Sequence, residues 1–262
     1  MKLLHRSARG VRPTAEGELL LKEAQELLRQ FDELPEKLRA GKAQITGSVQ
    51  LGVPAVLTKA IAGEFMMACR DALPHITLSF ASGDSSVLRG RVVERTLDLA
   101  LVFENDPLPG LSRIELFRQL MYVLHIDEAH RDTASIRYAD LGTWPLLSSG
   151  SIWRQDIVRK YAALGITPNF VSETQDLASH LAAVSAGIGA IFLPFSGIPG
   201  ADNIIFTPIS DFHVTASLVW PHDVQLSRAA EAVSALLVPF IARYIEEKQP
   251  PGIESLMAGD KR

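Results

Sequence analysis

The run "LDLALVF" at residues 97–103 decides the fold class. Seven residues of which six are apolar, without alternation, are typical of a strand covered on both faces, as in a parallel sheet. Outward from this run, "SVQLGV" (48–53) and "HITLSFA" (75–81) predict two more strands, and the segments 59–72 and 85–95 predict the helices between them. Strands that alternate with helices indicate an α/β fold, and these elements form one βαβαβ lobe.

The rest of the chain repeats this order and predicts a second lobe. The adjacent runs 111–117 and 119–125 are expected to be two strands that lead across to it. Strands follow at 144–149, 168–174 and 190–193, with helices at 152–164 and 175–186, then a return strand at 213–220 and a closing helix at 227–247. We expect lobe one to comprise about 45–120 and 221–248, and lobe two about 121–220.

The segment "LLHRSARGVRPTAEGELLL" (3–21) begins with a basic cluster, Arg6, Arg9 and Arg12, broken by small residues. This pattern predicts a flexible, cationic turn. Such charges fit contact with the phosphates of nucleic acid. Taken alone, these charges fit a solvated terminus better than phosphate contact.

A helix is predicted from Thr14, a candidate N-cap, with Glu16 and Glu18 in the first turn, where the helix dipole favours acids. Its apolar residues are spaced 4, 3, 4, 3 and 4, which is a heptad seam typical of helix pairing between chains, although packing on the same chain remains an alternative. We expect a kink or break at Pro35. The seam is Leu20, Ala24, Leu27, Phe31, Leu34 and Leu38.

Composition narrows the classes of function. A formal net charge of −4 argues against a basic surface over the whole chain, so any contact with nucleic acid must be local. The single cysteine, Cys69, is expected to be buried and inert, and the histidines, including His125 and His130, have no metal-ligand spacing. We expect no cofactor and no metal. A signal-peptide pattern and a membrane-spanning apolar run are both lacking, which predicts a cytoplasmic protein without membrane contact.

Catalytic motifs are also missing from the sequence, including G-x-S-x-G and H-E-x-x-H, so an enzyme is not expected. Gly187 and Gly189 in "AGIGAIFLP" follow a predicted helix instead of opening one, and we interpret them as helix-ending glycines and not as a dinucleotide motif.

The N-terminal segment resembles the part of LysR-type transcriptional regulators that runs from the wing of the winged helix-turn-helix into the dimerising linker helix. "GSVQLGV", "RTLDLALVF" and "ETQDLASHLAAVSAGIGAIFLP" resemble the effector-binding domain of the same family, which has two lobes like a periplasmic binding protein. Within this family, the sequence resembles the subgroup around the nitrogen assimilation control protein most. The resemblance divides the chain into a wing remnant (1–13), a linker helix (14–44) and an effector domain (45–262), and implies that the DNA-reading helices are missing.

Loops that follow the predicted strands supply the candidate site, because open α/β sheets bind ligands beyond the carboxyl ends of their strands. Helix N-termini and hydroxyl groups there could bind an anion, and Arg154 could add a charge; helix capping is the simpler role for each hydroxyl. The resemblance implies an effector cleft between the lobes for a small metabolite, often a carboxylate. The candidate effector-binding residues are Ala55, Val56, Thr58, Ser85, Ser86, Ser149, Ser151, Arg154 and Thr174.

The predicted function is therefore a LysR-type regulator, here mainly its dimerisation and effector-sensing part. The partners implied are promoter DNA in the full-length form, a small-molecule effector of anionic character, and other copies of the chain in a homodimer or homotetramer. A stand-alone small-molecule binding protein of the periplasmic-receptor fold, without a DNA role, is the alternative.

Overall fold

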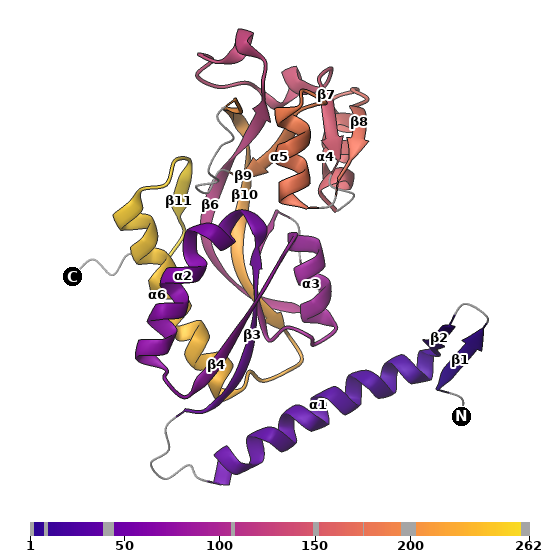
Figure 1. Ribbon diagram of the computed structural model, residues 1–262, viewed down its shortest axis with the longest axis vertical. Helices are drawn as coiled ribbons and strands as arrows, with labels where there is room; N and C mark the ends of the chain where they lie inside the picture. Colours follow the sequence, from indigo (N-terminus) through magenta and orange to yellow (C-terminus); the bar gives the residue numbers. More distant parts are fainter. Residues whose placement is uncertain are drawn as a thin grey trace.

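The chain folds into two α/β lobes that share two long strands, and a helical arm with a short hairpin precedes them (Figure 1). The structure, a computed structural model, describes residues 3–7, 10–38, 45–105, 108–148, 152–174, 176–194 and 203–257. The prediction of an α/β protein with two lobes is confirmed.

The first lobe is built around β3 (Gly47–Pro54), which pairs in parallel with β4 (Ile76–Gly83) on one side and with β5 (Leu99–Glu104) on the other. The helix α2 (Ala55–Ala72) connects β3 to β4, and α3 (Ser85–Val93) connects β4 to β5. The first of these helices begins four residues earlier than predicted. Pro54 ends the strand and is also the residue before the first helical turn, so no loop separates the two elements.

Helices cover both faces of the first lobe's sheet, as the run at 97–103 predicted. All six residues of β5 are buried. Alternate side chains pack into the main core, which also contains residues of α2 and of α6 (Arg228–Lys248). The others, Ala100 and Val102, pack with Leu88 and Val92 of α3. Strand β5 is therefore covered on both faces, which explains its unbroken apolar sequence.

Two strands run through both lobes: β6 (Leu111–His125) and β10 (Ile205–Pro221), which pair with each other. The prediction of two separate strands at 111–117 and 119–125 is wrong. Arg118, the polar residue between them, pairs with Thr215 on one side and with Glu254 on the other, so the strand continues without interruption.

The boundary between the lobes also differs from the expected position. The register of β10 shifts between Pro208 and His213, and its residues Thr215–Val219 pair with β5 of the first lobe. The end of this strand therefore belongs to lobe one, and the chain leaves lobe two several residues before 220.

The second lobe contains β7 (Pro145–Ser148), β8 (Asn169–Glu173) and β9 (Ile191–Pro194), together with α4 (Ile152–Ala163), α5 (Leu177–Ser185) and the 3₁₀ turns η1 (Glu128–His130) and η2 (Tyr138–Leu141). β9 pairs with β6, and β7 pairs with β8. Gly187 follows α5 with φ +72°, a conformation that favours glycine. Its interpretation as a helix-ending glycine is confirmed.

After α6, a short strand that the sequence analysis did not predict, β11 (Ile253–Ser255), pairs with β6 in the first lobe. Cys69 is buried in the main core, as expected, and burial raises the pKa of its thiol to about 11.

The N-terminal segment forms an antiparallel hairpin of β1 (Leu4–Ser7) and β2 (Gly10–Pro13), followed by α1 (Ala15–Leu38). Arg6 and Arg12 lie in the paired strands of this hairpin instead of a flexible segment, and the turn predicted at Arg9 lies outside the described residues. The N-cap is confirmed: the Thr14 hydroxyl accepts a hydrogen bond of 3.0 Å from the Gly17 N–H. A Cβ at Gly17 would collide with the Leu3 carbonyl, so only glycine allows the helix to lie against the hairpin strand.

The break expected at Pro35 does not occur, because α1 continues to Leu38. The proline lies three residues from the helix end, where the loss of one backbone hydrogen bond disturbs little of the helix.

Candidate functional site

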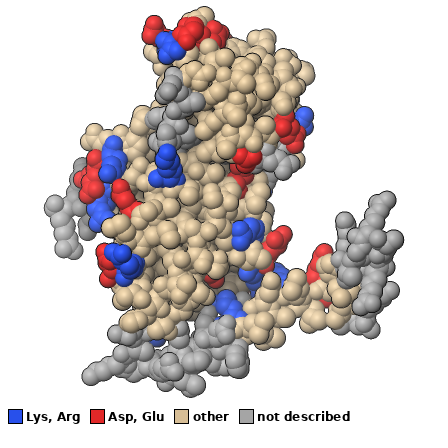
Figure 2. Space-filling view, in the orientation of Figure 1, with Lys and Arg blue, Asp and Glu red and all other residues tan. Residues whose placement is uncertain are grey.

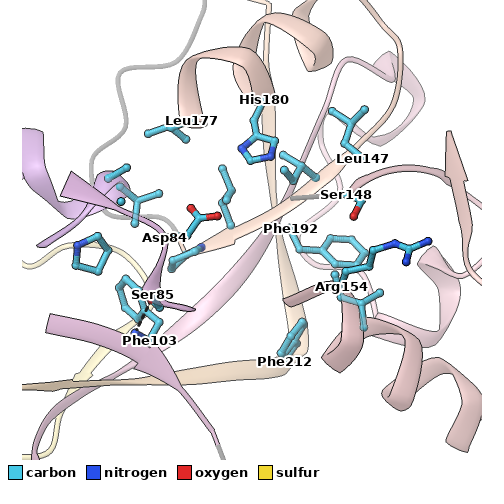
Figure 3. A pocket seen from close by; sticks show the side chains of 18 residues that line it. Asp84, Ser85, Phe103, Leu147, Ser148, Arg154, Leu177, His180, Phe192 and Phe212 are labelled. Carbon is cyan, nitrogen blue, oxygen red and sulfur yellow. Dashed lines mark hydrogen bonds between the residues drawn. The ribbon is translucent and has the colours of Figure 1, made fainter. Parts of the chain in front are cut away.

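A pocket lies between the two lobes and is lined by residues of both. The first lobe supplies the N-terminal ends of α2 and α3, and the second lobe supplies the end of β7, α4, α5 and β9 (Figure 3). Its volume, counted as the space open to the centre of a water-sized sphere, is about 60 Å³. One water needs roughly 10–15 Å³ of such space, so the pocket suits a small organic molecule of only a few heavy atoms.

The first turn of α2 faces this pocket. Pro54, Ala55 and Val56 line it, and the N-cap residue, Pro54, makes no side-chain capping hydrogen bond. The first N–H groups of a helix have no acceptor within the helix, and the helix dipole adds positive character there. This end of α2 therefore favours an anionic or carbonyl group of a ligand.

Asp84 and Ser85 bring the start of α3 to the same pocket. Asp84 is the N-cap residue, but its carboxylate makes no capping hydrogen bond. The Ser85 hydroxyl is 3% exposed and accepts a hydrogen bond of 2.9 Å from the Phe103 N–H. Ser85 thus fastens α3 to β5, and Asp84 carries the acceptor that is open to the pocket.

His180 of α5 forms the opposite wall and is only 2% exposed. Burial lowers its pKa, and a hydrogen bond to the Thr174 backbone and the nearby Asp176 act in the opposite direction. Its Nε2 atom has no hydrogen-bond partner among the described residues. In Figure 3, Asp84 and His180 both point into the space between the lobes.

Asp176 is the N-cap of α5 and accepts hydrogen bonds from the Ser179 N–H (2.9 Å) and hydroxyl (2.6 Å). The pKa of Asp84 is raised, first by burial and second by the negative charge of Asp176. Two carboxylates from different lobes therefore repel each other, and of the two only Asp84 lines the pocket.

Arg154 lines the pocket with its side chain, but its guanidinium carbon lies 4.9 Å from the centre of the Phe170 ring. In Figure 3 the guanidinium extends away from Asp84 and His180. In this arrangement Arg154 does not neutralise the charge of the pocket acids.

The other predicted effector residues have different places. The Thr58 hydroxyl stays within the first lobe: it donates to the Pro54 carbonyl at 3.1 Å and forms a hydrogen bond of 3.0 Å with Ser82 Oγ. Ser86 and Thr174 are partly buried, and neither they nor Thr58 are among the residues that line the pocket. Ser149 and Ser151 lie outside the described residues. Of the seven predicted residues that the structure describes, four line the pocket: Ala55, Val56, Ser85 and Arg154.

Asp84 and His180 were not among the residues predicted from the sequence to bind an effector. Asp84 precedes the predicted Ser85 in the loop "SGDSS", which follows a strand and therefore borders the cleft. The rule that selected Ser85 could also have selected the Asp84 carboxylate. Nothing in the sequence distinguishes His180 from the other histidines. His125, by contrast, has both ring nitrogens satisfied, by Thr207 Oγ1 at 2.9 Å and by the Asp127 N–H at 3.1 Å.

The predicted seam of α1 is open to solvent where its side chains are described. Leu20 is 47% exposed, Leu27 is 65% exposed and Ala24 is half-buried. The side chains of Phe31, Leu34 and Leu38, like those of Arg6 and Arg12, lie outside the description, as does all of Arg9. Leu19, Leu21 and Leu28 are exposed as well, so α1 carries an apolar surface that the described part of the chain does not cover.

On the visible face of the two lobes, the charges of the described residues form no broad patch of one sign (Figure 2). On the face shown in Figure 2, Lys and Arg lie in small groups that mostly include Asp or Glu. Among the described residues, no cluster of His, Cys, Asp and Glu is suited to a metal ion. The described helices also include none with the length and apolar character needed to cross a membrane.

Comparisons with known proteins agree with this architecture. The family model of the LysR substrate binding domain matches residues 42–240. The nitrogen assimilation regulatory protein nac from Escherichia coli (strain K12) is 25% identical over 256 residues, which cover 95% of this chain and 83% of that protein.

Two solved structures share the fold. The effector binding domain of QuiR in complex with shikimate has a TM-score of 0.66 at 18% identity and covers 76% of this chain and 99% of its own. Full-length CbnR complexed with its target DNA has a TM-score of 0.62 at 18% identity and covers 93% of this chain and 84% of its own. Since the family model spans more than half of the sequence, the chain belongs to the LysR family of transcriptional regulators and contains the substrate-binding domain of that family.

Proposed function

We propose that the chain is the dimerising and effector-sensing part of a LysR-type regulator, and that a small molecule in the interlobe pocket controls its action on promoter DNA. The main support for this proposal is the pocket, because its walls come from two lobes that are joined by β6 and β10. A ligand that contacts both walls favours one lobe arrangement by its difference in affinity for the two arrangements. QuiR holds shikimate and CbnR holds DNA in the related structures, which supports both halves of the proposal.

The effector is expected to carry an anionic group that faces the first turn of α2. The first turn there is the positive end of the dipole of an 18-residue helix. The expected place of action is the cytoplasm, where promoter DNA would be available.

A pocket-filling variant tests this function. Leu193→Trp places a large ring at a residue that lines the pocket, and Val87→Trp, at an exposed position of α3, is the matched control. Thermal-shift screening with small carboxylates should find ligands that stabilise the wild type and Val87→Trp, but not Leu193→Trp. Stabilisation of all three proteins to the same extent would place the ligand elsewhere and refute the pocket.

The exposed leucines of α1 support pairing of two linker helices, in a homodimer that could pair further to a homotetramer. Full burial of a leucine contributes about 1.5–3 kcal/mol. Scaled by the exposed fractions of Leu20 and Leu27, pairing would gain about 1 and 1.5 kcal/mol per chain, or about 5 kcal/mol for two helices. This gain corresponds to an affinity difference of at least about 1,000-fold.

The double variant Leu20→Glu/Leu27→Glu should therefore lose one step of association in analytical ultracentrifugation. Ala15→Glu, which adds one charge to the same helix outside the seam, should assemble like the wild type. An unchanged sedimentation profile of the double variant would exclude the linker-helix dimer.

The hairpin that precedes α1 supports contact with the DNA backbone through Arg6, Arg9 and Arg12. Three cations near phosphates give salt-sensitive affinity without reading of bases. In gel retardation, this chain should bind DNA weakly and without sequence preference. Selective retardation of one DNA sequence at about 150 mM salt, where such contacts are much weakened, would contradict this assignment.

A further inference from the structure

The carboxylate of Asp84 is an unused acceptor in the pocket. As N-cap of α3 it would normally accept a hydrogen bond from the first helical turn, but it makes none. It has no hydrogen-bond or ion-pair partner among the described residues, and it points into the space between the lobes (Figure 3). Partly buried carboxylates in proteins are usually stabilised by a cation or by hydrogen-bond donors, and Asp84 lacks both among the described residues.

His180 supplies a second unused acceptor from the other lobe. Its hydrogen bond with the Thr174 backbone involves Nδ1, since Nε2 has no partner, and the Thr174 N–H already donates to the Ser148 carbonyl. Nδ1–H therefore donates to the Thr174 carbonyl. In a neutral imidazole the other nitrogen then carries a lone pair. Burial lowers the pKa of His180, which favours this neutral form.

Two observations show that positive charge is what these groups lack. The pKa of Asp84 is raised first by burial and second by repulsion from Asp176, the N-cap of α5 in the other lobe, and no cation is among the groups that shift it. The nearest guanidinium that lines the pocket, Arg154, packs on Phe170 instead. A bound ammonium group would relieve the repulsion between the lobes and donate to both Asp84 and His180 Nε2.

We propose that the interlobe pocket binds a small zwitterion of the α-amino-acid class, whose ammonium group lies between Asp84 and His180 and whose carboxylate faces the N-terminus of α2. The inference rests on the proposed function and specifies its ligand. Both charges are needed: the ammonium draws lobe two onto lobe one, and the carboxylate uses the helix end that carries Ala55. The pocket volume of about 60 Å³ limits the side chain to a few atoms.

The experiment compares three molecules of similar size that differ in charge: L-alanine, propionate and ethylamine, with glycine and L-serine to vary the side chain. Binding to the full chain is measured by isothermal titration calorimetry at pH 7.5. At least one of the amino acids should bind at least tenfold more tightly than either propionate or ethylamine. Asp84→Asn and His180→Phe should each weaken this binding at least tenfold, and Glu94→Gln, at the exposed opposite end of α3, should leave it unchanged. Circular dichroism spectra of the variants verify that they fold.

The outcomes separate this inference from the proposed function. If propionate binds as tightly as the amino acids, and Asp84→Asn does not weaken binding, the ammonium site is refuted. The proposal of an anionic effector is then kept. If none of the amino acids binds at 10 mM, the zwitterion class is refuted, and the Leu193→Trp screen still decides whether the pocket holds another ligand. If Asp84→Asn folds and binds amino acids as the wild type does, Asp84 is not the ammonium partner and the inference fails.

Discussion

The variant Ser85→Ala tests how the pocket wall of the first lobe is held in place. The buried Ser85 hydroxyl accepts the Phe103 N–H at 2.9 Å and joins the start of α3 to β5. The substitution removes one hydrogen bond and leaves the buried N–H without this acceptor, which together cost about 2 kcal/mol. For chains of this size 1 kcal/mol corresponds to roughly 2–4 °C, so Tm should fall by about 4–8 °C.

Thermal unfolding followed by circular dichroism measures this change, with Ser86→Ala as the matched control. Ser86 is the next residue of the same helix, and the described residues include no hydrogen-bond partner for its hydroxyl. Its variant should stay within about 1 °C of the wild type, as substitutions without such contacts usually do. A Ser85→Ala protein that melts within 1 °C of the wild type would refute the structural role of this hydroxyl. The Ser85 hydroxyl would then again be a candidate to bind the ligand.

Three further predictions follow from single residues. Thr14→Ala removes the N-cap of α1 and should speed hydrogen exchange of the Gly17 amide about fivefold, equivalent to about 1 kcal/mol, with recovery in Thr14→Ser; equal exchange rates would argue against the cap. Because burial and Asp176 raise the folded-state pKa of Asp84 above 3.8, its ionised form destabilises the ligand-free protein above that pKa and not at pH values below 3.8. Asp84→Asn should therefore raise Tm by about 1–3 °C at pH 7.5, with a gain that shrinks as the pH falls toward 4, and a gain that grows on acidification would show the opposite sign. Burial raises the pKa of Cys69 to about 11, so a thiol reagent should label it at pH 8 only after unfolding; rapid labelling of the native protein would contradict its burial.

Local patterns in the sequence predicted most elements of the fold, but not how far the long strands extend. The apolar run at 97–103 and the alternation around it predicted the lobe-one sheet, because burial on both faces leaves a strong signal. The same reasoning divided β6 at Arg118, since the partners of that residue, Thr215 and Glu254, come from distant parts of the chain. Strand pairing of this kind is a tertiary property that a local window does not contain.

The sequence predicted the loops that border the interlobe pocket but not which side chains face it. The rule that ligands bind beyond strand ends selected these loops, and four of the seven described candidate residues line the pocket. Hydroxyl groups were favoured as ligand donors, whereas Ser85 bonds within the protein, and the Asp84 carboxylate and the buried His180 Nε2 have no hydrogen-bond partner among the described residues. Whether a polar group is satisfied depends on neighbours such as Phe103, which are assembled only in the folded chain.

The central claim is that a paired linker helix joins two-lobed effector domains, and the molar mass in solution tests it most directly. Light scattering would be measured on the full chain and on a chain that starts at Thr46, which lacks the hairpin and α1. We predict a dimer or tetramer for the full chain and the loss of one association step in the shorter chain. The same mass per chain for both proteins would contradict the account and reduce the molecule to a ligand-binding module without linker-helix pairing.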